Sequence, residues 1–155
     1  MVDFISQSIR KFGDWTGTID ACVLTYEDRF LRRKVLKTVQ DKTLLVDLAH
    51  TTSLDHGDAF ELGDGGLIEI SAADEPLLQI TGDLVQLAWH IGNRHTPCQI
   101  ESDRLLIQDD PVIGHMLEHL GATVMQIKEP FTPEGGAYGH GRTHSHEHGH
   151  TAHDH

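Results

Sequence analysis

The last sixteen residues of the chain are rich in histidine, whose neutral imidazole is a common ligand for transition metals. Seven histidines there are spaced by one to three small or polar residues: His140, His144, His146, His148, His150, His153 and His155. Several imidazoles can therefore converge on one ion while the backbone bends. Imidazole suits Ni(II), Cu(II), Zn(II) and Co(II), and the lack of nearby thiols disfavours Cu(I). The spacing predicts a multidentate metal-binding tail with moderate affinity and fast exchange.

The tail also contains a sequence pattern of zinc proteases. His146–His150 read H-E-H-G-H, which matches H-E-x-x-H. That pattern works on a helix, where the two histidines share one face and the glutamate polarises a water molecule. Glycines and polar residues surround it here, so we interpret the match as a by-product of composition. Outside the tail, no set of nucleophile, base and third metal ligand is recognisable, and the chain is not expected to be an enzyme.

His95 is the most informative histidine before the tail. It follows a predicted helix and precedes a predicted strand, within A-W-H-I-G-N-R-H-T-P. A metal ion needs four to six donors, so His95 forms a strong site only if a two-fold axis brings the same residue from a second chain beside it. The spacing of the residues alone does not decide whether two copies of His95 meet in this way. Cys98, three residues later, could add a thiolate, but a buried strand cysteine is the favoured interpretation.

The other histidines carry weaker patterns. His115 and His119 are four residues apart on a predicted helix and could chelate one ion, although two solvated surface residues are the favoured interpretation. His90 lies off the buried face of the first predicted helix. His50 and His56 flank turn residues and predict no site.

Net charge narrows the classes of partner. The chain has 155 residues, with 24 Asp and Glu against 12 Lys and Arg, and a formal charge of -12. Nucleic acid and anionic membranes would be repelled, whereas cations would be attracted. No export signal or long apolar stretch is recognisable, and the two cysteines lie far apart. These features predict a cytoplasmic protein without a membrane segment.

Residues 1–74 are expected to form a small all-β domain. Four short β-rich runs, CVLTY, RKVLKTV, TLLVDLA and GLIEIS, are separated by turn-forming residues. The polar segment Ala72–Pro76 is expected to be a hinge, because its proline discourages helix before it.

Residues 75–130 predict a second domain with the element order βαββαβ, which is ferredoxin-like. Apolar residues at Leu84, Leu87, Ala88 and Ile91 indicate a helix that stops at Gly92-Asn93. A second helix is expected to begin at Asp110 and Pro111 and to end at Gly121. The fold class is therefore α+β, with residues 131–155 as a flexible tail.

These motifs together resemble one known family. The segments A-W-H-I-G-N-R-H-T-P (Ala88–Pro97), G-H-M-L-E-H-L-G (Gly114–Gly121) and P-F-T-P-E-G-G-A-Y (Pro130–Tyr138), with D-H-G-D in the first half and the histidine-rich end, resemble the UreE family of urease accessory proteins. The resemblance implies a homodimeric nickel chaperone for urease assembly. It implies that His95 and its symmetry mate bind nickel at the dimer interface and that the tail adds ligands. The implied acceptors are the accessory GTPase UreG and then apo-urease with the other accessory proteins, and the β domain would dock partners.

Two functions remain open from the residues themselves. A delivery protein would need both His95 and the tail, whereas a metal-storage or buffering protein would need only the tail. Removing the tail would abolish all metal binding in the second case and only part of it in the first.

Overall fold

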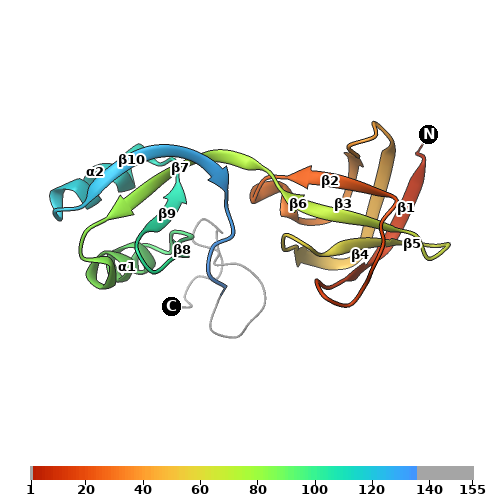
Figure 1. Cartoon of the computed structure of the whole chain (residues 1–155), viewed down its shortest axis with the longest axis horizontal. Coiled ribbons are helices and arrows are strands. Elements are labelled where there is room, and N and C mark those ends of the chain that lie inside the picture. The colour runs from red at the N-terminus through yellow and green to blue at the C-terminus, as the bar shows by residue number, and fades with distance from the viewer. Residues whose placement is uncertain (1, 136–155) are drawn as a thin grey trace. The chain divides into compact units, whose positions relative to one another are not determined.

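The chain divides into two compact units, Met1–Ala73 and Asp74–His155. The structure is a computed structural model, and it describes residues 2–135 (Figure 1). Within that range no helix is both long and apolar enough to cross a membrane.

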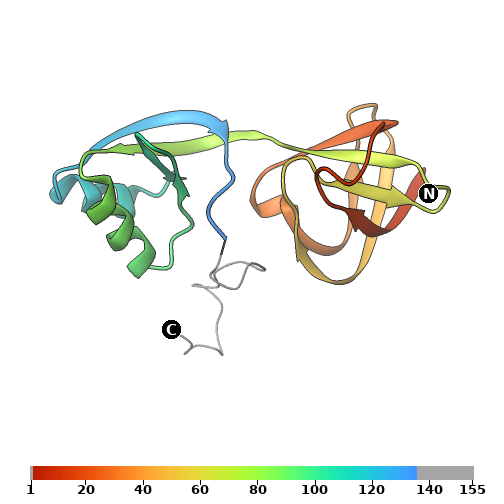
Figure 2. The same cartoon turned by 60° about the horizontal axis from the view of Figure 1, so that its bottom comes forward.

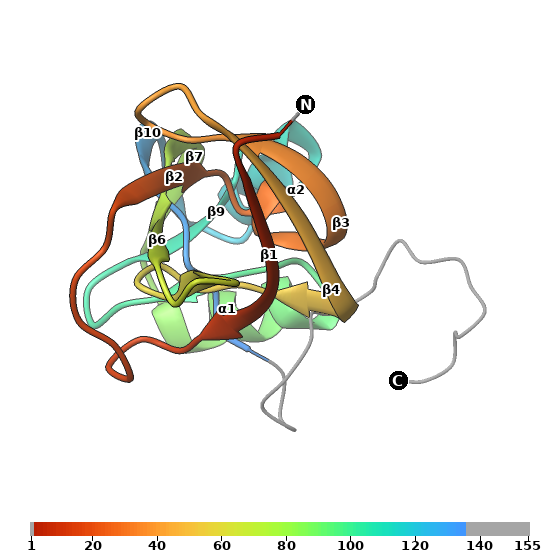
Figure 3. The ribbon, with the colours of Figure 1, turned by 90° about the vertical axis from the view of Figure 1, so that its right-hand side faces the viewer.

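The first unit is built almost entirely of β-strands (Figures 1 and 3). Its elements are β1 (Phe4–Arg10), β2 (Asp20–Leu24), the 3-10 turn η1 (Glu27–Arg29), β3 (Phe30–Lys37), β4 (Thr43–Ser53), β5 (Ala59–Leu62) and β6 (Leu67–Ala72). They form one sheet in the order β2-β6-β5-β1-β4-β3. The four predicted runs correspond to β2, β3, β4 and β6. β1 and β5 were not predicted from the sequence, because FISQSIR is largely polar and AFEL is very short.

The two edge strands of this sheet are brought together by the β3–β4 turn. The Val39 N–H donates to the Ala21 carbonyl of β2 (2.7 Å). The Gln40 side-chain amide donates to the Ile19 carbonyl (3.0 Å). The sheet therefore curves around one apolar core, in which Cys22, Leu44, Val46, Phe60, Ile68 and Ile70 have no exposed surface.

The segment Ala72–Pro76, expected to be a polar hinge between the domains, contains the boundary between the two units, but most of it is strand. β6 ends at Ala72 and β7 begins at Asp74, which leaves only Ala73 between them. Pro76 is compatible with a strand here because β7 pairs with β10 along its whole length but with β9 only from Leu77 onward. Its missing N–H therefore falls where β7 has a partner on one side only.

The second unit has the predicted element order βαββαβ. Its elements are β7 (Asp74–Thr81), α1 (Leu84–Asn93), β8 (Gln99–Ile100), β9 (Leu105–Gln108), α2 (Pro111–His119) and β10 (Thr123–Pro130). The strands form an antiparallel sheet in the order β10-β7-β9-β8, and both helices cover the same face of it (Figure 2). The prediction of a two-domain α+β chain, with a β domain followed by a mixed domain, is confirmed.

The two helices start in the same way and pack into one core. Asp83 caps α1 by accepting from the Gln86 N–H (3.3 Å), and Asp110 caps α2 by accepting from the Val112 and Ile113 N–H groups (3.0 and 3.2 Å). The buried helix residues Leu87, Ile91 and Leu117 meet a cluster from the sheet that consists of Leu78, Ile80, Leu105 and Ile107. Because both helices are held against one face, the loops that follow them are fixed as well.

Candidate metal site

His95 occupies the turn that ends α1. Its N–H donates to the Gly92 carbonyl (2.9 Å), and the next N–H, that of Thr96, reaches back to the Ile91 carbonyl (3.3 Å). This pair of bonds is the Schellman motif, in which the residue after the C-cap adopts a left-handed backbone conformation. His95 has φ 57. The helix therefore ends at Asn93, within the predicted stop at Gly92-Asn93, and places a half-buried His95 at a defined point of its C-terminal turn.

Glycine is the usual residue at this position because it lacks a Cβ. A non-glycine residue there costs on the order of 1 kcal/mol in backbone strain. His95 and Asp41 are the non-glycine residues with positive φ among residues 2–135. A histidine at such a strained position points to a use for its side chain.

α1 also presents an exposed apolar face that leads toward His95. Val85 is 86% exposed and Trp89 is 63% exposed, one helical turn apart, and Gly92 continues the same line. This Val85–Trp89–Gly92 face points away from the side that buries Leu87 and Ile91. This face was not predicted from the sequence, although apolar residues at i and i+4 outside the core stripe were the available signal.

Cys98 lies three residues after His95 and packs partly against the core of the second unit. Burial raises the pKa of its thiol to about 11, with a smaller contribution from the Glu134 carboxylate. The thiol is therefore protonated at neutral pH, whereas a metal ligand would have to be a thiolate. This arrangement agrees with the interpretation of Cys98 as a packing residue.

The chain that leads into the tail is attached beside this loop. After β10, the Thr132 N–H donates to the Gln99 side-chain oxygen (2.8 Å), and the Glu134 N–H donates to the Cys98 carbonyl (2.8 Å). Phe131 is completely buried. The segment at 131–135, which we call the tail base, is thus fixed next to the strand that follows His95. Its anchor, Phe131, was not identified from the sequence.

An ionic network holds β8 in the position that the tail base requires. Arg104 contacts the carboxylates of Glu101 and Glu129 (both 2.8 Å), and the Gln99 amide donates to Glu101 (2.7 Å). Hydrogen bonds from Arg104 hold the pKa values of both carboxyl groups below their usual range. The stabilisation is therefore complete above the ordinary carboxyl pKa and is lost as the pH falls through the lowered values.

The remaining histidines have varied settings. His56 accepts a hydrogen bond at Nδ1 from the Ala72 N–H (3.0 Å), so it has a structural role that spacing did not predict. His50 is exposed on β4, and His90 is half-buried with its ring edge-on to Trp89. His115 and His119 are exposed neighbours on α2. The seven tail histidines, His140 to His155, lie outside the described residues.

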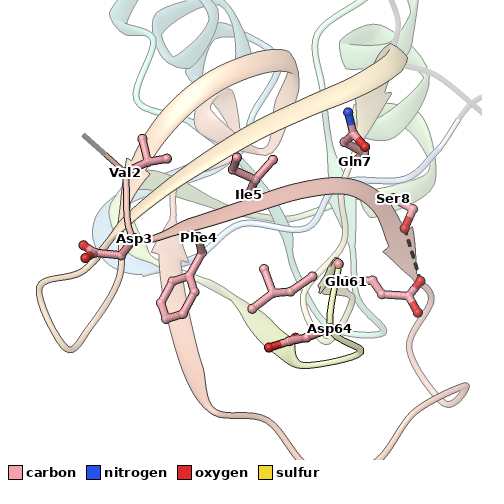
Figure 4. A pocket seen from close by; sticks show the side chains of 10 residues that line it. Val2, Asp3, Phe4, Ile5, Gln7, Ser8, Glu61 and Asp64 are labelled. Carbon is pink, nitrogen blue, oxygen red and sulfur yellow. Dashed lines mark hydrogen bonds between the residues drawn. The ribbon is translucent and has the colours of Figure 1, made fainter.

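Residues 2–135 do not contain a group of three or more His, Cys, Asp or Glu side chains placed to hold a metal ion. His95 in one chain is therefore an incomplete site. A cavity of about 620 Å³ in the first unit is no alternative, because acids and apolar residues but no imidazole or thiol line it (Figure 4). Two of its carboxylates are already engaged: Glu61 accepts from the Ser8 hydroxyl (3.1 Å) and Asp3 from the Thr43 N–H (2.8 Å).

Comparison with known proteins gives one consistent family. The model for the N-terminal domain of the UreE urease accessory protein matches residues 5–73, and the model for its C-terminal domain matches residues 67–155. The urease accessory protein UreE of Ruegeria pomeroyi is 68% identical over 92% of this chain and 96% of its own length. The proteins of the same name from Cereibacter sphaeroides (57% identical; 93% of this chain, 80% of that one) and Rhodobacter capsulatus (58%; 88% of each) are also similar.

Proposed function

Because the chain belongs to the UreE family of urease accessory proteins, we propose that it serves urease maturation as a homodimeric nickel metallochaperone. Ni(II) is its cargo, and Zn(II), Cu(II) and Co(II) are competing ions that suit the same ligands. The protein works in the cytoplasm and passes nickel to the accessory GTPase UreG and then to apo-urease with the other accessory proteins.

Two copies of His95 form the centre of the proposed nickel site. One imidazole gives too few donors, and residues 2–135 do not contain a group of three or more ligating side chains within one chain. The exposed Val85–Trp89–Gly92 face supports dimerisation, because burying Val85 and Trp89 against a second copy would remove a large apolar area from water. A two-fold axis beside the end of α1 would then bring the two His95 side chains together.

The tail can reach this site from the same chain, and this observation carries the proposal. The Glu134 N–H donates a hydrogen bond to the Cys98 carbonyl. Cys98 is three residues from His95 and therefore within about 11 Å of it along the chain. His140 is six residues beyond Glu134, and an extended segment of that length spans about 20 Å. The first tail histidine can therefore reach His95, and the later ones have more reach.

Such a site suits transfer of an ion rather than permanent storage. Two protein-held imidazoles keep the nickel in place, while tail imidazoles and water can leave one at a time as an acceptor supplies its own ligands. The ion then need not be released as a free aquo-ion. Acid should empty the site, because a protonated imidazole cannot bind a metal.

Native mass spectrometry with limiting nickel tests this function. The parent chain should hold one tightly bound ion per two chains, and His95→Ala should remain dimeric but lose that ion. Truncation after Gly139 should lower the total number of ions more than it lowers the highest affinity. His50→Ala is the matched control, because it removes an exposed histidine far along the chain from the site.

Two results would contradict the proposal. A strictly monomeric chain that still binds nickel tightly would remove the shared site. If truncation after Gly139 abolished all binding while His95→Ala changed nothing, the protein would be a tail-based metal store instead of a delivery protein.

A further inference from the structure

We propose that His115 and His119 form a second, weaker site for a divalent transition-metal ion at the C-terminal end of α2. The site is separate from His95 and from the tail, and it uses only residues within the described part of the second unit. It would bind ions with a preference for nitrogen ligands, such as Ni(II), Cu(II) and Zn(II).

The spacing of the two rings matches a shared ion. His115 and His119 lie one helical turn apart, and their ring centroids are 4.9 Å apart with the planes at 73°. Two imidazoles bound to one ion, with metal–nitrogen distances of about 2.0–2.1 Å, have centroids about 4.5 to 5.2 Å apart for octahedral and tetrahedral angles. The side chains therefore need only rotate their rings, and not move along the helix, to bind one ion together.

Both rings are accessible to an ion from solvent. The His115 side chain is 73% exposed, and His119 is also exposed. Neither ring packs into the core, since α2 buries Gly114 and Leu117 on its other side. The helix makes the pairing persistent, because its backbone fixes the distance between the two Cβ atoms. Metal binding therefore loses little further conformational entropy, because the folded helix already holds the two ligands close together.

Negatively charged groups and the C-terminal end of α2 surround the pair of histidines. The Glu118 carboxylate lies 4.0 Å from His115 Nδ1. His115 and Glu118 also line a hollow of about 240 Å³, together with Asp109 and Gln126. His119 is in the last turn of α2, where the helix dipole favours a positive charge. These groups attract a cation, but none of them is positioned as a third ligand. Water must therefore complete the coordination, and the metal ion should exchange rapidly with solvent.

Nuclear magnetic resonance of the full chain can separate this site from the others. Nickel chloride is titrated into the ¹⁵N-labelled protein beyond the amount taken up by His95 and the tail. The backbone signals of Gly114 to Gly121 should then show paramagnetic shifts and broadening as α2 fills. His115→Gln or His119→Gln should each weaken nickel binding at α2 about ten-fold or more, because the second imidazole of a chelate acts at a high effective concentration.

Matched variants decide between a chelate and a coincidental contact. His50→Gln removes an exposed histidine from a strand and His95→Ala removes the proposed shared site, and both should leave the α2 response unchanged. Adding Val112→His to His119→Gln places a new histidine three residues before His115, on an exposed helix position, and should restore binding.

Three outcomes would overturn the proposal. The α2 signals could fail to respond in the parent chain. They could respond equally in His119→Gln, which would indicate nickel held by the tail or by one histidine alone. They could also disappear in His95→Ala, which would make the response part of the shared site. The first two outcomes do not bear on delivery through His95, and in all three cases that function is tested separately by the ion count per dimer.

Discussion

The two helices of the second unit end in the same hydrogen-bonded turn but with different residues at its strained position. In α2, the Gly121 N–H donates to the Glu118 carbonyl and the Ala122 N–H to the Leu117 carbonyl, both at 3.0 Å. Gly121 has φ 94. In α1 the equivalent residue is His95, with φ 57. Where only the backbone matters, the chain uses glycine, and where it uses histidine we infer that the imidazole is needed.

Replacing His95 by glycine should separate function from stability. His95→Gly keeps the turn and removes the ligand, so nickel affinity at the tightest site should fall at least about 100-fold, since changes that merely support a ligand already cost 10–100-fold. The free energy of unfolding should rise by about 0.5–1 kcal/mol as the strain is relieved. Calorimetric nickel titration and denaturant unfolding of the nickel-free protein measure the two effects.

Gly121→Ala is the matched variant at the other helix end. It should lower the free energy of unfolding by about 1 kcal/mol and leave nickel affinity unchanged, because no atom lies within 4 Å of the added Cβ and only the backbone is strained. If His95→Gly destabilised the nickel-free protein as much as Gly121→Ala does, the histidine would be a structural residue, and the argument from strain would be lost.

A second contrast concerns the glycines within the helices. A Cβ on Gly114 of α2 would lie 2.8 Å from Leu78 Cδ1, and Leu78 is buried, whereas a Cβ on Gly92 of α1 would meet nothing within 4 Å. Gly114→Ala should therefore cost about 1 kcal/mol after its gain in helix propensity. Gly92→Ala should stabilise the monomer by about 0.5–1 kcal/mol. Thermal unfolding at low protein concentration measures both changes.

The Gly92 variant also tests the dimer face. Its new methyl group would lie on the line of Val85 and Trp89 that we propose to be covered by a second copy. Dilution experiments should then show a weaker dimer although each monomer is more stable. An unchanged dimer would indicate that the Val85–Trp89–Gly92 face is not the interface.

Sequence patterns predicted the second unit well because its two helices are amphipathic and have recognisable caps. The caps at Asp110 and Gly121 were readable from residue type, since proline and glycine have strong backbone preferences. The end of α1 at Gly92-Asn93 was also predicted correctly, but the left-handed conformation of His95 just after it has no sequence signal. In the first unit, the polar strand β1 is defined by its neighbours β4 and β5, which no local pattern reveals.

The candidate site was predictable only in part for a similar reason. Histidine spacing identified the tail, and the family resemblance singled out His95, but the link between them depends on contacts distant in sequence. The Glu134 N–H bonds to Cys98, thirty-six residues earlier in the chain. The exposed Val85–Trp89–Gly92 face could be distinguished from the core stripe only once the orientation of α1 on the sheet was known.

The smallest predicted effect concerns Cys98, which shares its loop with His95 but not its proposed role as a ligand. With its pKa raised to about 11, the thiol should be alkylated about 100-fold more slowly at pH 8 than a cysteine with the ordinary value of 9.0. Cys98→Ala should leave the tightest nickel affinity unchanged within about two-fold, because a half-buried, protonated thiol does not act as a metal ligand. Adding nickel should likewise not change the alkylation rate of Cys98. If nickel protected Cys98, or if Cys98→Ala weakened binding ten-fold, a thiolate would have to join the two imidazoles, and the contrast between a strained ligand and a packed neighbour would fail.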